Sequence, residues 1–395
     1  MKQVRFGIIG LGNQGAHYAY GLFNGGRLSE DCVLTAVCDI NPAKIEAIRP
    51  KLDKVNPAYF ENYIEMLDSG LCDAVLIEVP HYLHPEMAME CFKRNIHVIC
   101  EKPAGVYTKQ VREMNEFAQK HNARFAMMFN QRTNCIYRKM REIISEGGIG
   151  EMQRLTWIIT DWFRTRHYYD SGSWRATWAG EGGGVLINQS PHQLDLIQWI
   201  VGELPEAVNG FCQYGKWHDI EVEDEVTAYL RYKNGATGVF ITTTGELPGT
   251  NRLEISGTGG KLLCEDGKLW LQKNPEDMTV IRDTLDKMTA KSGALVEIET
   301  DGENPQHAGI INNVAAAILG KEPLFVDGSE GIRGVELMNA IELSGWKNGA
   351  LVTLPVDEEE YLSMLNERRA TSRHKVVDDS VVSDTADSFA GSQGK

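Results

Sequence analysis

An apolar run that leads into three spaced glycines constrains this chain more than any other feature. Residues 6–15 read Phe-Gly-Ile-Ile-Gly-Leu-Gly-Asn-Gln-Gly, so a predicted strand ends in the pattern G-x-G-x-x-G. The first glycine of this pattern allows a tight turn, the second lets the backbone approach a pyrophosphate, and the third permits close helix–strand packing. The N–H groups of the following helix point at the phosphates. The motif predicts a dinucleotide-binding turn formed by Gly10, Leu11, Gly12, Asn13, Gln14 and Gly15.

A second apolar run, Cys32–Cys38, ends in Asp39, which follows Gly15 by 24 residues. This is about the ~20-residue spacing expected for a carboxylate that binds the adenosine ribose, although a solvated acid at a strand end gives the same pattern. Ile40 and Asn41 bring no cation, and Lys44 is the nearest candidate. Because Asp39 would repel a 2′-phosphate, the sequence predicts NAD as the cofactor and disfavours NADP.

The composition excludes several classes of protein. A chain of 395 residues suggests two domains, and 42% hydrophobic and 24% charged residues are typical of a soluble globular protein. The net charge of −15 argues against a nucleic-acid or membrane partner. No apolar run approaches the ~18 residues of a membrane span, and the first strand begins too early for a signal peptide. We therefore expect a cytoplasmic protein.

The eight cysteines are scattered, without a CxxC pair. Several lie in apolar runs that read as strands, which favours buried free thiols in a reducing compartment over a zinc or disulfide framework. The sequence also lacks a His, Cys and Asp cluster of the kind that binds a metal, so no metal is expected.

The first 130 residues alternate short apolar runs with helical patterns, which predicts an α/β fold with a doubly wound parallel sheet. The candidate strands are Val4–Ile9, Val33–Cys38, Ala74–Glu78, His97–Cys100 and Arg124–Phe129, and the candidate helices include Pro85–Arg94 and Thr108–His121.

Residues 131–365 show a different pattern, with longer alternating runs that predict a second α/β domain with a mostly antiparallel sheet covered by helices on one face. The candidate strands are Gln153–Ile159, Val226–Tyr232, Thr237–Thr243, Arg252–Ser256 and Lys261–Glu265, followed by a helical pair, His307–Leu319 and Gly331–Lys347. Residues 366–395 are rich in Ser, Asp and Thr and read as a disordered tail.

The tripeptide Glu101-Lys102-Pro103 follows a predicted parallel strand. Ligands of a doubly wound sheet lie beyond the carboxyl ends of its strands, so Lys102 is placed to hydrogen-bond a substrate hydroxyl. A solvated lysine beside Glu101 is the alternative.

A glycine run, Gly182-Gly183-Gly184, precedes Asn188, His192 and Asp195. Three glycines indicate close backbone approach or positive φ. Two helix boundaries are compatible with this segment. In the first, Ser190 is the N-cap, Pro191 takes the first helical position and Gln193 completes a capping box. In the second, the helix begins near Val185 and bends at Pro191. The second alternative places Asn188 and His192 on one face. In both, Gly202 ends the helix.

These motifs together resemble one family. The glycine turn, Glu101-Lys102-Pro103 and the segment from Gly182 to Asp195 have the order and spacing of the Gfo/Idh/MocA oxidoreductases, the glucose–fructose oxidoreductase and inositol dehydrogenase family. The segments 80–85 (Pro-His-Tyr-Leu-His-Pro) and 147–150 (Gly-Gly-Ile-Gly) add smaller matches, and the resemblance covers roughly residues 1–360. It implies a Rossmann domain, a second domain whose open sheet serves substrate and oligomer contacts, and NAD(P) chemistry on sugars or cyclitols.

By this resemblance Lys102 and His192 take the catalytic positions. The family usually has Asp four residues before that histidine, whereas this chain has Asn188, which can orient a hydroxyl but puts a carboxylate-assisted proton relay in doubt. Further cofactor contacts are expected from Pro80, His81, His84, Glu101, Lys102, Asn130 and Arg175.

Aromatic and polar residues alternate between Asp161 and Trp178. Sugar sites combine rings that stack on C–H faces with groups that bind hydroxyls, although protein interfaces favour the same residues. We expect substrate contacts from Arg164, His167, Tyr168, Trp174 and Asn188. His307, at the start of a late helix, fits the cleft and the surface equally well.

The sequence predicts an NAD-dependent oxidoreductase that moves a hydride between a ring carbinol of a sugar, glycoside or cyclitol and nicotinamide. Two alternatives stay open. One is a glycoside-processing enzyme that retains NAD and forms a transient keto-sugar, and the other is a non-catalytic regulator that senses sugars or dinucleotides. A homo-oligomer, dimer or tetramer, is expected.

Overall fold

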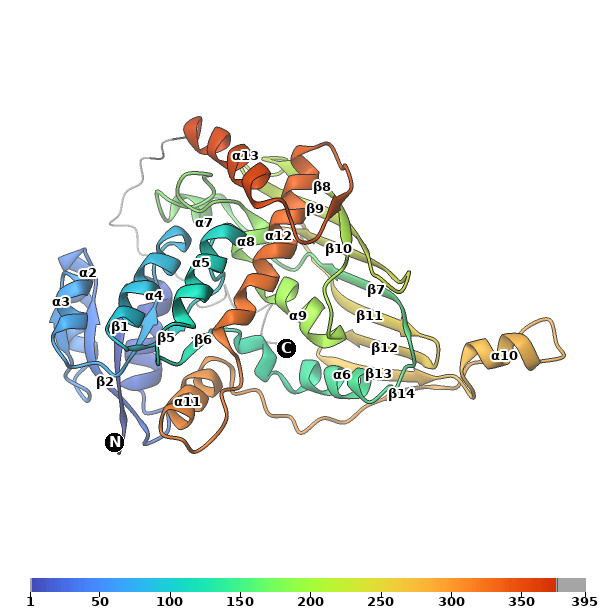
Figure 1. Cartoon of the computed structure of the whole chain (residues 1–395), viewed down its shortest axis with the longest axis horizontal. Coiled ribbons are helices and arrows are strands. Elements are labelled where there is room, and N and C mark those ends of the chain that lie inside the picture. Colours follow the sequence, from blue (N-terminus) through green and yellow to red (C-terminus); the bar gives the residue numbers. More distant parts are fainter. Residues whose placement is uncertain (1, 374, 376–395) are drawn as a thin grey trace. The chain divides into compact units, whose positions relative to one another are not determined.

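The computed structural model describes residues 2–373 and 375, which form two compact units (Figure 1). The first unit comprises the chain up to Thr133 together with Asn304–Val335, and the second contains Asn134–Glu303 and the chain from Glu336 onward. The domain boundary predicted at residue 130 lies close to Thr133, where the chain first passes from one unit to the other. The prediction of a second domain that is continuous in sequence is wrong, because residues 304–335 belong to the first unit.

The first unit is built on a six-stranded parallel sheet in the order β3-β2-β1-β4-β5-β6. The chain moves outward from β1 on one side and then on the other, which leaves a switch point between β1 and β4. The strands are β1 (Val4–Ile9), β2 (Cys32–Cys38), β3 (Ala58–Phe60), β4 (Ala74–Ile77), β5 (His97–Cys100) and β6 (Phe125–Met127). All four residues of β4 are buried, as expected for a strand covered on both faces.

Helical segments connect or follow these strands. They are α1 (Asn13–Ala16), the π-helical η1 (His17–Phe23), α2 (Pro42–Ile48), η2 (Arg49–Lys51), α3 (Tyr63–Asp68), η3 (His81–Leu83), α4 (His84–Lys93), α5 (Thr108–Ala118), η4 (Asn130–Thr133), α11 (Gln306–Ile318) and η5 (Gly328–Glu330). The late helix α11 belongs here because its apolar face is buried and hydrogen bonds hold its first residue and its middle to the rest of the unit. The Ser29 amide donates to Asn312 Oδ1 at 2.9 Å, and the Gln306 amide donates to Thr133 Oγ1 at 2.9 Å.

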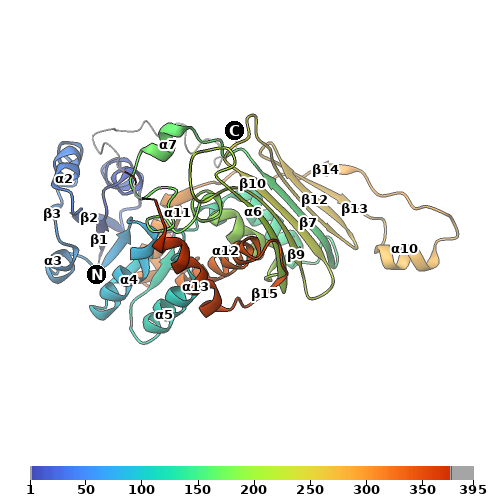
Figure 2. The same cartoon turned by 90° about the horizontal axis from the view of Figure 1, so that it is seen from above.

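The second unit contains a nine-stranded sheet in the order β14-β13-β12-β11-β7-β10-β9-β8-β15 (Figure 2). Only β7 and β10 pair in parallel among its described strands, so the predicted mostly antiparallel sheet is confirmed. The strands are β7 (Met152–Ile159), β8 (Ala207–Tyr214), β9 (Glu223–Arg231), β10 (Thr237–Thr243), β11 (Asn251–Gly257), β12 (Gly260–Glu265), β13 (Lys268–Lys273), β14 (Leu295–Glu297) and β15 (Val352–Thr353).

Helices cover one face of this sheet. They include α6 (Cys135–Ser145), α9 (Pro191–Val201) and α12 (Gly331–Trp346), whose Ser344 hydroxyl accepts from the Gly210 amide of β8 at 2.7 Å. On the other face, Thr227, Tyr229 and Arg231 of β9 alternate with buried residues and are exposed. The remaining helices are α7 (Arg166–Asp170), α8 (Val185–Asn188), α10 (Met278–Thr284) and α13 (Glu358–Ala370).

The last helix corrects the expectation for the tail. The composition predicts disorder from residue 366, yet residues 366–370 complete α13, which Asp357 caps by accepting from the amides of Glu359 and Glu360. Within the predicted tail, residues 374 and 376–395 lie outside the described residues.

Candidate functional site

The glycine turn after β1 is held by contacts that only glycine permits. Gly10 has φ +95°, and a Cβ there would lie 2.1 Å from the carbonyl oxygen of Glu78. A Cβ on Gly15 would lie 1.9 Å from the Gly10 carbonyl oxygen. A Cβ on Gly12 would meet no atom within 4 Å, so this backbone faces open space that a phosphate group can enter. The turn therefore fits the pyrophosphate of a dinucleotide.

Asp39 at the end of β2 supports this turn directly. The carboxylate is buried and accepts hydrogen bonds from the Leu11 amide at 2.7 Å and the Asn41 amide at 2.9 Å. A carboxylate has about four acceptor sites, so capacity remains for ribose hydroxyls. Lys44 Nζ lies 3.5 Å from Asp39 Oδ2, which places the cation noted in the sequence beside this carboxylate.

Titratable side chains at the ends of β4 and β5, together with Tyr18 of η1, form what we call the strand-end cluster: Tyr18, Glu78, Glu101 and Lys102. The Tyr18 hydroxyl donates a short hydrogen bond to Glu101 Oε1, and the Lys102 amide donates to Glu101 Oε2 at 3.0 Å. Burial raises the pKa of Glu101, while the Lys102 cation and these hydrogen bonds oppose the shift. Sequence reasoning identified Glu101 and Lys102 but missed Tyr18 and Glu78.

The predicted cofactor residues Pro80, His81 and His84 lie in the connection from β4 to α4 or at the start of α4. Pro80 precedes η3, which begins at His81, and His84 opens α4. The ring nitrogens of His84 lie 2.7 Å from the Pro103 carbonyl oxygen and 2.8 Å from the Val79 carbonyl oxygen. His84 thus ties the exits of β4 and β5 together, and its contact with a cofactor stays a prediction.

The start of α11 contributes further polar groups to the first unit. Asn130 is buried and donates to Gln306 Oε1 at 2.5 Å. The His307 ring centroid lies 5.3 Å from that of Tyr18, so His307 lies next to the strand-end cluster. Burial, with smaller effects from His17 and Lys102, lowers the pKa of His307 to about 3.

In the second unit the glycine run shows both predicted properties. Gly182 has φ +90°, and a Cβ on Gly184 would lie 2.0 Å from the Glu223 carbonyl oxygen. The buried Glu223 side chain accepts from the amides of Gly184 and Leu186 at 2.9 and 3.0 Å. Burial raises the pKa of Glu223 to about 7 despite these hydrogen bonds. Glu223 therefore holds the start of α8, and sequence reasoning missed it.

The helix around His192 combines features of both predicted alternatives. A short helix, α8, ends at Asn188, and α9 begins with Ser190 as N-cap and Pro191 in its first turn. The expected capping box is wrong, because the Ser190 hydroxyl lies 3.0 Å from Thr242 Oγ1 and makes no side-chain cap. His192 lies in the first turn of α9, and Gly202 ends the helix in the left-handed conformation, as predicted.

Several predicted site residues form one hydrogen-bonded cluster, which we call the Tyr168 network. The Tyr168 hydroxyl donates to Asn188 Oδ1 at 2.9 Å and accepts from Arg175 Nη1 at 3.0 Å and Gln189 Nε2 at 2.9 Å. The guanidinium groups of Arg164 and Arg175 lie 5.0 and 4.6 Å from the Tyr168 ring centroid. The Tyr168 hydroxyl is thus fully engaged within the protein, which favours a positioning role over direct substrate contact.

The remaining predicted substrate residues lie around this network. Arg175 stacks on Trp174 at 4.6 Å from its ring centroid. His167 is exposed on α7. Arg175 was expected at the cofactor, and within the second unit it contacts Tyr168 and Trp174.

Glu181 is a functional candidate that the sequence motifs did not identify. It is buried, and Oε1 accepts a short hydrogen bond from Asn188 Nδ2, while Oε2 accepts from the Ala176 amide at 2.5 Å. Ala176 has φ +52°, so the carboxylate also holds a left-handed backbone position. A carboxylate therefore contacts Asn188, although the sequence has none at position 188.

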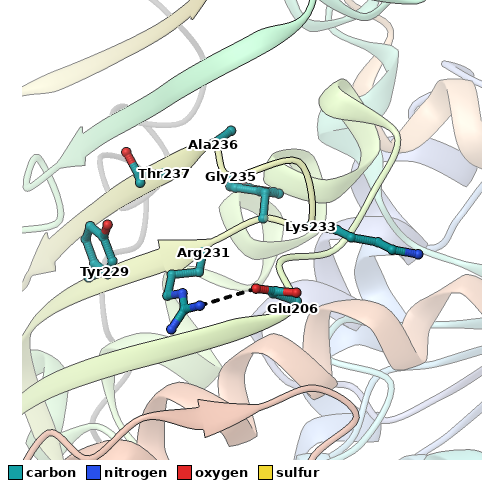
Figure 3. A pocket seen from close by; sticks show the side chains of 8 residues that line it. Glu206, Tyr229, Arg231, Lys233, Gly235, Ala236 and Thr237 are labelled. Carbon is teal, nitrogen blue, oxygen red and sulfur yellow. Dashed lines mark ion pairs between the residues drawn. The ribbon is translucent and has the colours of Figure 1, made fainter.

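A surface hollow of the second unit lies near the turn between β9 and β10 (Figure 3). Its polar lining includes Arg231, 3.5 Å from Glu206, and contains no predicted site residue. Among the described residues, no group of three or more His, Cys, Asp or Glu side chains is placed to hold a metal ion, and no helix is long and apolar enough to cross a membrane.

Comparison with known proteins identifies similar sequences and folds. The myo-inositol 2-dehydrogenase of Thermotoga maritima is 28% identical over 270 residues, covering 67% of this chain and 75% of that protein. Levoglucosan dehydrogenase of Pseudarthrobacter phenanthrenivorans is 26% identical over 56% of this chain and 66% of its own length. The WlbA dehydrogenase of Bordetella pertussis, solved with NADH and UDP-GlcNAcA, has a TM-score of 0.73 and 25% identity, covering 90% of this chain and 100% of that chain.

Family models account for both parts of the chain. Residues 4–129 match the model described as "Oxidoreductase family, NAD-binding Rossmann fold", and residues 137–263 match the "GFO/IDH/MocA C-terminal domain". These matches cover the glycine turn, the strand-end cluster and the His192 segment. The chain belongs to the Gfo/Idh/MocA family of NAD(P)-dependent oxidoreductases.

Proposed function

We propose that this protein is an NAD-dependent dehydrogenase that oxidises or reduces a ring carbinol of a sugar, glycoside or cyclitol. The observation that carries the proposal is the glycine turn, whose Gly12 backbone faces open space beside the buried Asp39 carboxylate. Dehydrogenase relatives that act on myo-inositol and levoglucosan support the substrate class.

The coenzyme would be held by the turn and by Asp39. The turn binds the pyrophosphate through backbone amides, and Asp39 accepts hydrogen bonds from the ribose hydroxyls. The negative charge of Asp39 favours NAD over NADP, although Lys44 at 3.5 Å offsets part of this charge. Bound NAD supplies the hydride acceptor.

The protein supplies proton transfer and orientation. His192 takes the hydroxyl proton during oxidation and returns it during reduction, and Lys102 holds and polarises the same oxygen. Asn188, whose amide is fixed by Glu181 and Tyr168, orients a neighbouring hydroxyl. Arg164, Trp174 and His167 contribute the ring stacking and hydrogen bonds that a polyhydroxylated substrate requires.

The residues of the second unit also support an oligomer. The exposed face of β9 presents Tyr229 among alternating residues, which suits a homo-oligomeric contact through the open sheet. The eight cysteines are free, in keeping with a location in the cytoplasm.

A screen of sugars, glycosides and inositols for NADH formation, followed by NMR of the product, tests this function. Stoichiometric NADH accumulation with a ring ketone as product supports the dehydrogenase. A transformed glycoside with coenzyme still bound and no free NADH would favour keto-sugar chemistry with retained NAD. NAD binding without turnover of any compound in a broad panel would favour a sensing regulator.

A further inference from the structure

The strand order of the first unit determines which half of a dinucleotide lies over which strand end. Asp39 follows β2, the glycine turn follows β1, and β4 and β5 continue the sheet on the other side of β1. With the adenosine ribose at Asp39 and the pyrophosphate at the turn, the nicotinamide half extends over the ends of β4 and β5. Those ends carry Glu78 and Glu101.

Glu78 lies directly beneath the glycine turn. A Cβ on Gly15 would lie 3.2 Å from Glu78 Cβ, and the Glu78 carbonyl is the group that excludes a side chain at Gly10. Both carboxyl oxygens of Glu78 are buried and have no hydrogen-bond partner among the described residues. A buried carboxylate with no donor is costly, so Glu78 is held as the neutral acid.

Electrostatics support the same protonation state. Burial and the negative charge of Glu101 raise the pKa of Glu78 well above its usual range, and the Lys102 cation opposes this shift. Two carboxyl groups at neighbouring strand ends do not both ionise readily beside one lysine. Because Glu101 accepts hydrogen bonds from Tyr18 and Lys102, Glu101 keeps the negative charge and Glu78 keeps the proton.

We propose that Glu78 is a proton-accepting site whose occupancy follows the oxidation state of the bound coenzyme. It is ionised beside the cationic nicotinamide ring of NAD and protonated beside the neutral ring of NADH. This inference rests on the proposed function. During oxidation the carbinol carbon loses a hydride to nicotinamide, the hydroxyl O–H bond breaks, and its proton goes to His192. As the ring loses its positive charge, the Glu78 carboxylate forms an O–H bond with a second proton, which comes from water.

Five titratable groups of the first unit do not explain such a proton near neutral pH. Burial raises the pKa of Tyr18 and of Cys100 well above their usual ranges, so both stay protonated. From α4 and α11, burial lowers the pKa of His84 and brings that of His307 to about 3, so both are neutral. His17 on η1 also has a pKa lowered by burial.

Counting protons during coenzyme binding tests the proposal without any substrate. NAD and NADH would be titrated into the full-length protein in weak buffer with a pH indicator, and Kd measured from about pH 6 to about pH 9. We expect NAD binding to release a proton that NADH binding does not release. NAD affinity should rise with pH, by up to about tenfold per pH unit for one coupled proton. Equal proton counts for the two coenzymes would overturn the proposal.

Two glutamate variants assign the proton. Glu78→Gln keeps the size of the side chain but cannot ionise, so it should bind both coenzymes, lose the difference in proton release and bind NAD with an affinity independent of pH. Glu86→Gln, a change at an exposed position on α4, should behave like the wild type. Persistent proton release in Glu78→Gln would refute the assignment. A wild-type protein that binds neither coenzyme would refute the proposed function itself, and this inference with it.

Discussion

The side-chain amide of Asn188 donates to the Glu181 carboxylate and accepts from the Tyr168 hydroxyl at 2.9 Å. These two contacts determine which end of the amide faces which partner, because a carboxylate accepts hydrogen bonds only. Position 188 has no carboxylate of its own, but the carboxylate of Glu181, seven residues earlier, contacts it. Glu181 positions Asn188 and does not itself replace the missing acid.

Asn188→Asp should destabilise the protein, because it sets a second carboxylate against Glu181. Like charges raise the pKa of the new acid above its unfolded value of about 3.9. The loss in the free energy of unfolding is thus absent below about pH 3.9 and grows as pH rises, to about 1–3 kcal/mol at neutral pH. Thermal unfolding from about pH 4 to about pH 8 measures it. The double variant Glu181→Gln/Asn188→Asp should recover stability, since the side-chain amide introduced at position 181 can donate to the new acid. If Asn188→Asp unfolds at the same temperature as the wild type at neutral pH, the contact between Asn188 and Glu181 is contradicted.

Glu223→Gln should make stability less dependent on pH. The pKa of Glu223 is raised to about 7 in the folded protein by burial, above its ordinary value of 4.5. Ionisation therefore lowers the free energy of unfolding progressively as pH rises from about 4.5 to about 7. At higher pH the full loss remains. Glutamine keeps an oxygen for the amides of Gly184 and Leu186 but cannot ionise.

Urea unfolding at about pH 5 and about pH 8 tests this expectation, with a gain for the variant at the higher pH of about 1.4 kcal/mol per unit of pKa shift. Asp219→Asn, at an exposed position on the same segment, is a control outside the buried pair that Glu223 makes with Glu342. A variant less stable than the wild type at both pH values would show that Glu223 stabilises α8 as the anion.

The sequence predicts those parts of the site that local chemistry specifies. Gly10 and Gly15 have a fixed spacing because the contacts that demand glycine arise within one turn. The end of α9 at Gly202 is also determined locally, since glycine adopts φ +86° without strain. The strand boundaries predicted by hydrophobic alternation lie within three residues of those observed, because burial on one or both faces repeats over short distances.

Long-range packing explains what the sequence does not reveal. Glu78, Glu181 and Glu223 were missed because a glutamate outside a motif reads as a solvated side chain, and only the fold buries it. The return of α11 to the first unit depends on contacts of Asn312 with Ser29, which are 283 residues apart. The short edge strand β15 has two residues, too few for a periodic pattern.

Asp39→Ser should narrow the preference for NAD over NADP. It removes the charge that repels a 2′-phosphate and leaves Lys44 nearby as a cation. The substitution also removes an acceptor for the Leu11 and Asn41 amides, so the unfolding temperature serves as the control for damage to the turn. The ratio of kcat/KM for the two cofactors is the measurement. Comparable wild-type kcat/KM values would be evidence against the predicted preference.

Lys102→Ala and His192→Ala should each abolish most turnover while NAD binding stays nearly intact. Both groups act on the reacting hydroxyl, and an acid–base group typically contributes about 10²–10⁴-fold in rate. Asn188→Ala should cost less, because an amide orients a hydroxyl but does not relay a proton at neutral pH. Steady-state rates together with NADH fluorescence titrations separate chemistry from binding. A larger loss for Asn188→Ala than for His192→Ala would show that the base is misassigned.

Substrate recognition should depend on the hydroxyl groups of the ring and on the segment from Arg164 to Trp178. A site built to bind hydroxyls rejects deoxy analogues, because its polar groups are left unpaired, and it hardly uses simple aliphatic alcohols. Alanine at Arg164, His167 or Tyr168 should raise KM for the sugar without lowering NAD affinity. Tyr168→Phe separates the roles within the cluster, since it keeps the ring beneath Arg164 and Arg175 but removes the donor to Asn188.

We expect Tyr168→Phe to lower kcat with a small change in KM, as a positioning residue does, and Tyr168→Ala to raise KM as well. Glu146→Ala, at the exposed end of α6, is the control for surface changes in the same unit and should leave both constants unchanged. A crystal soaked with a turned-over sugar gives the decisive view. A ring bound far from residues 164–178, with these side chains buried between subunits, would assign the cluster to an interface, because Trp, Tyr and Arg are also the residues that protein contacts favour.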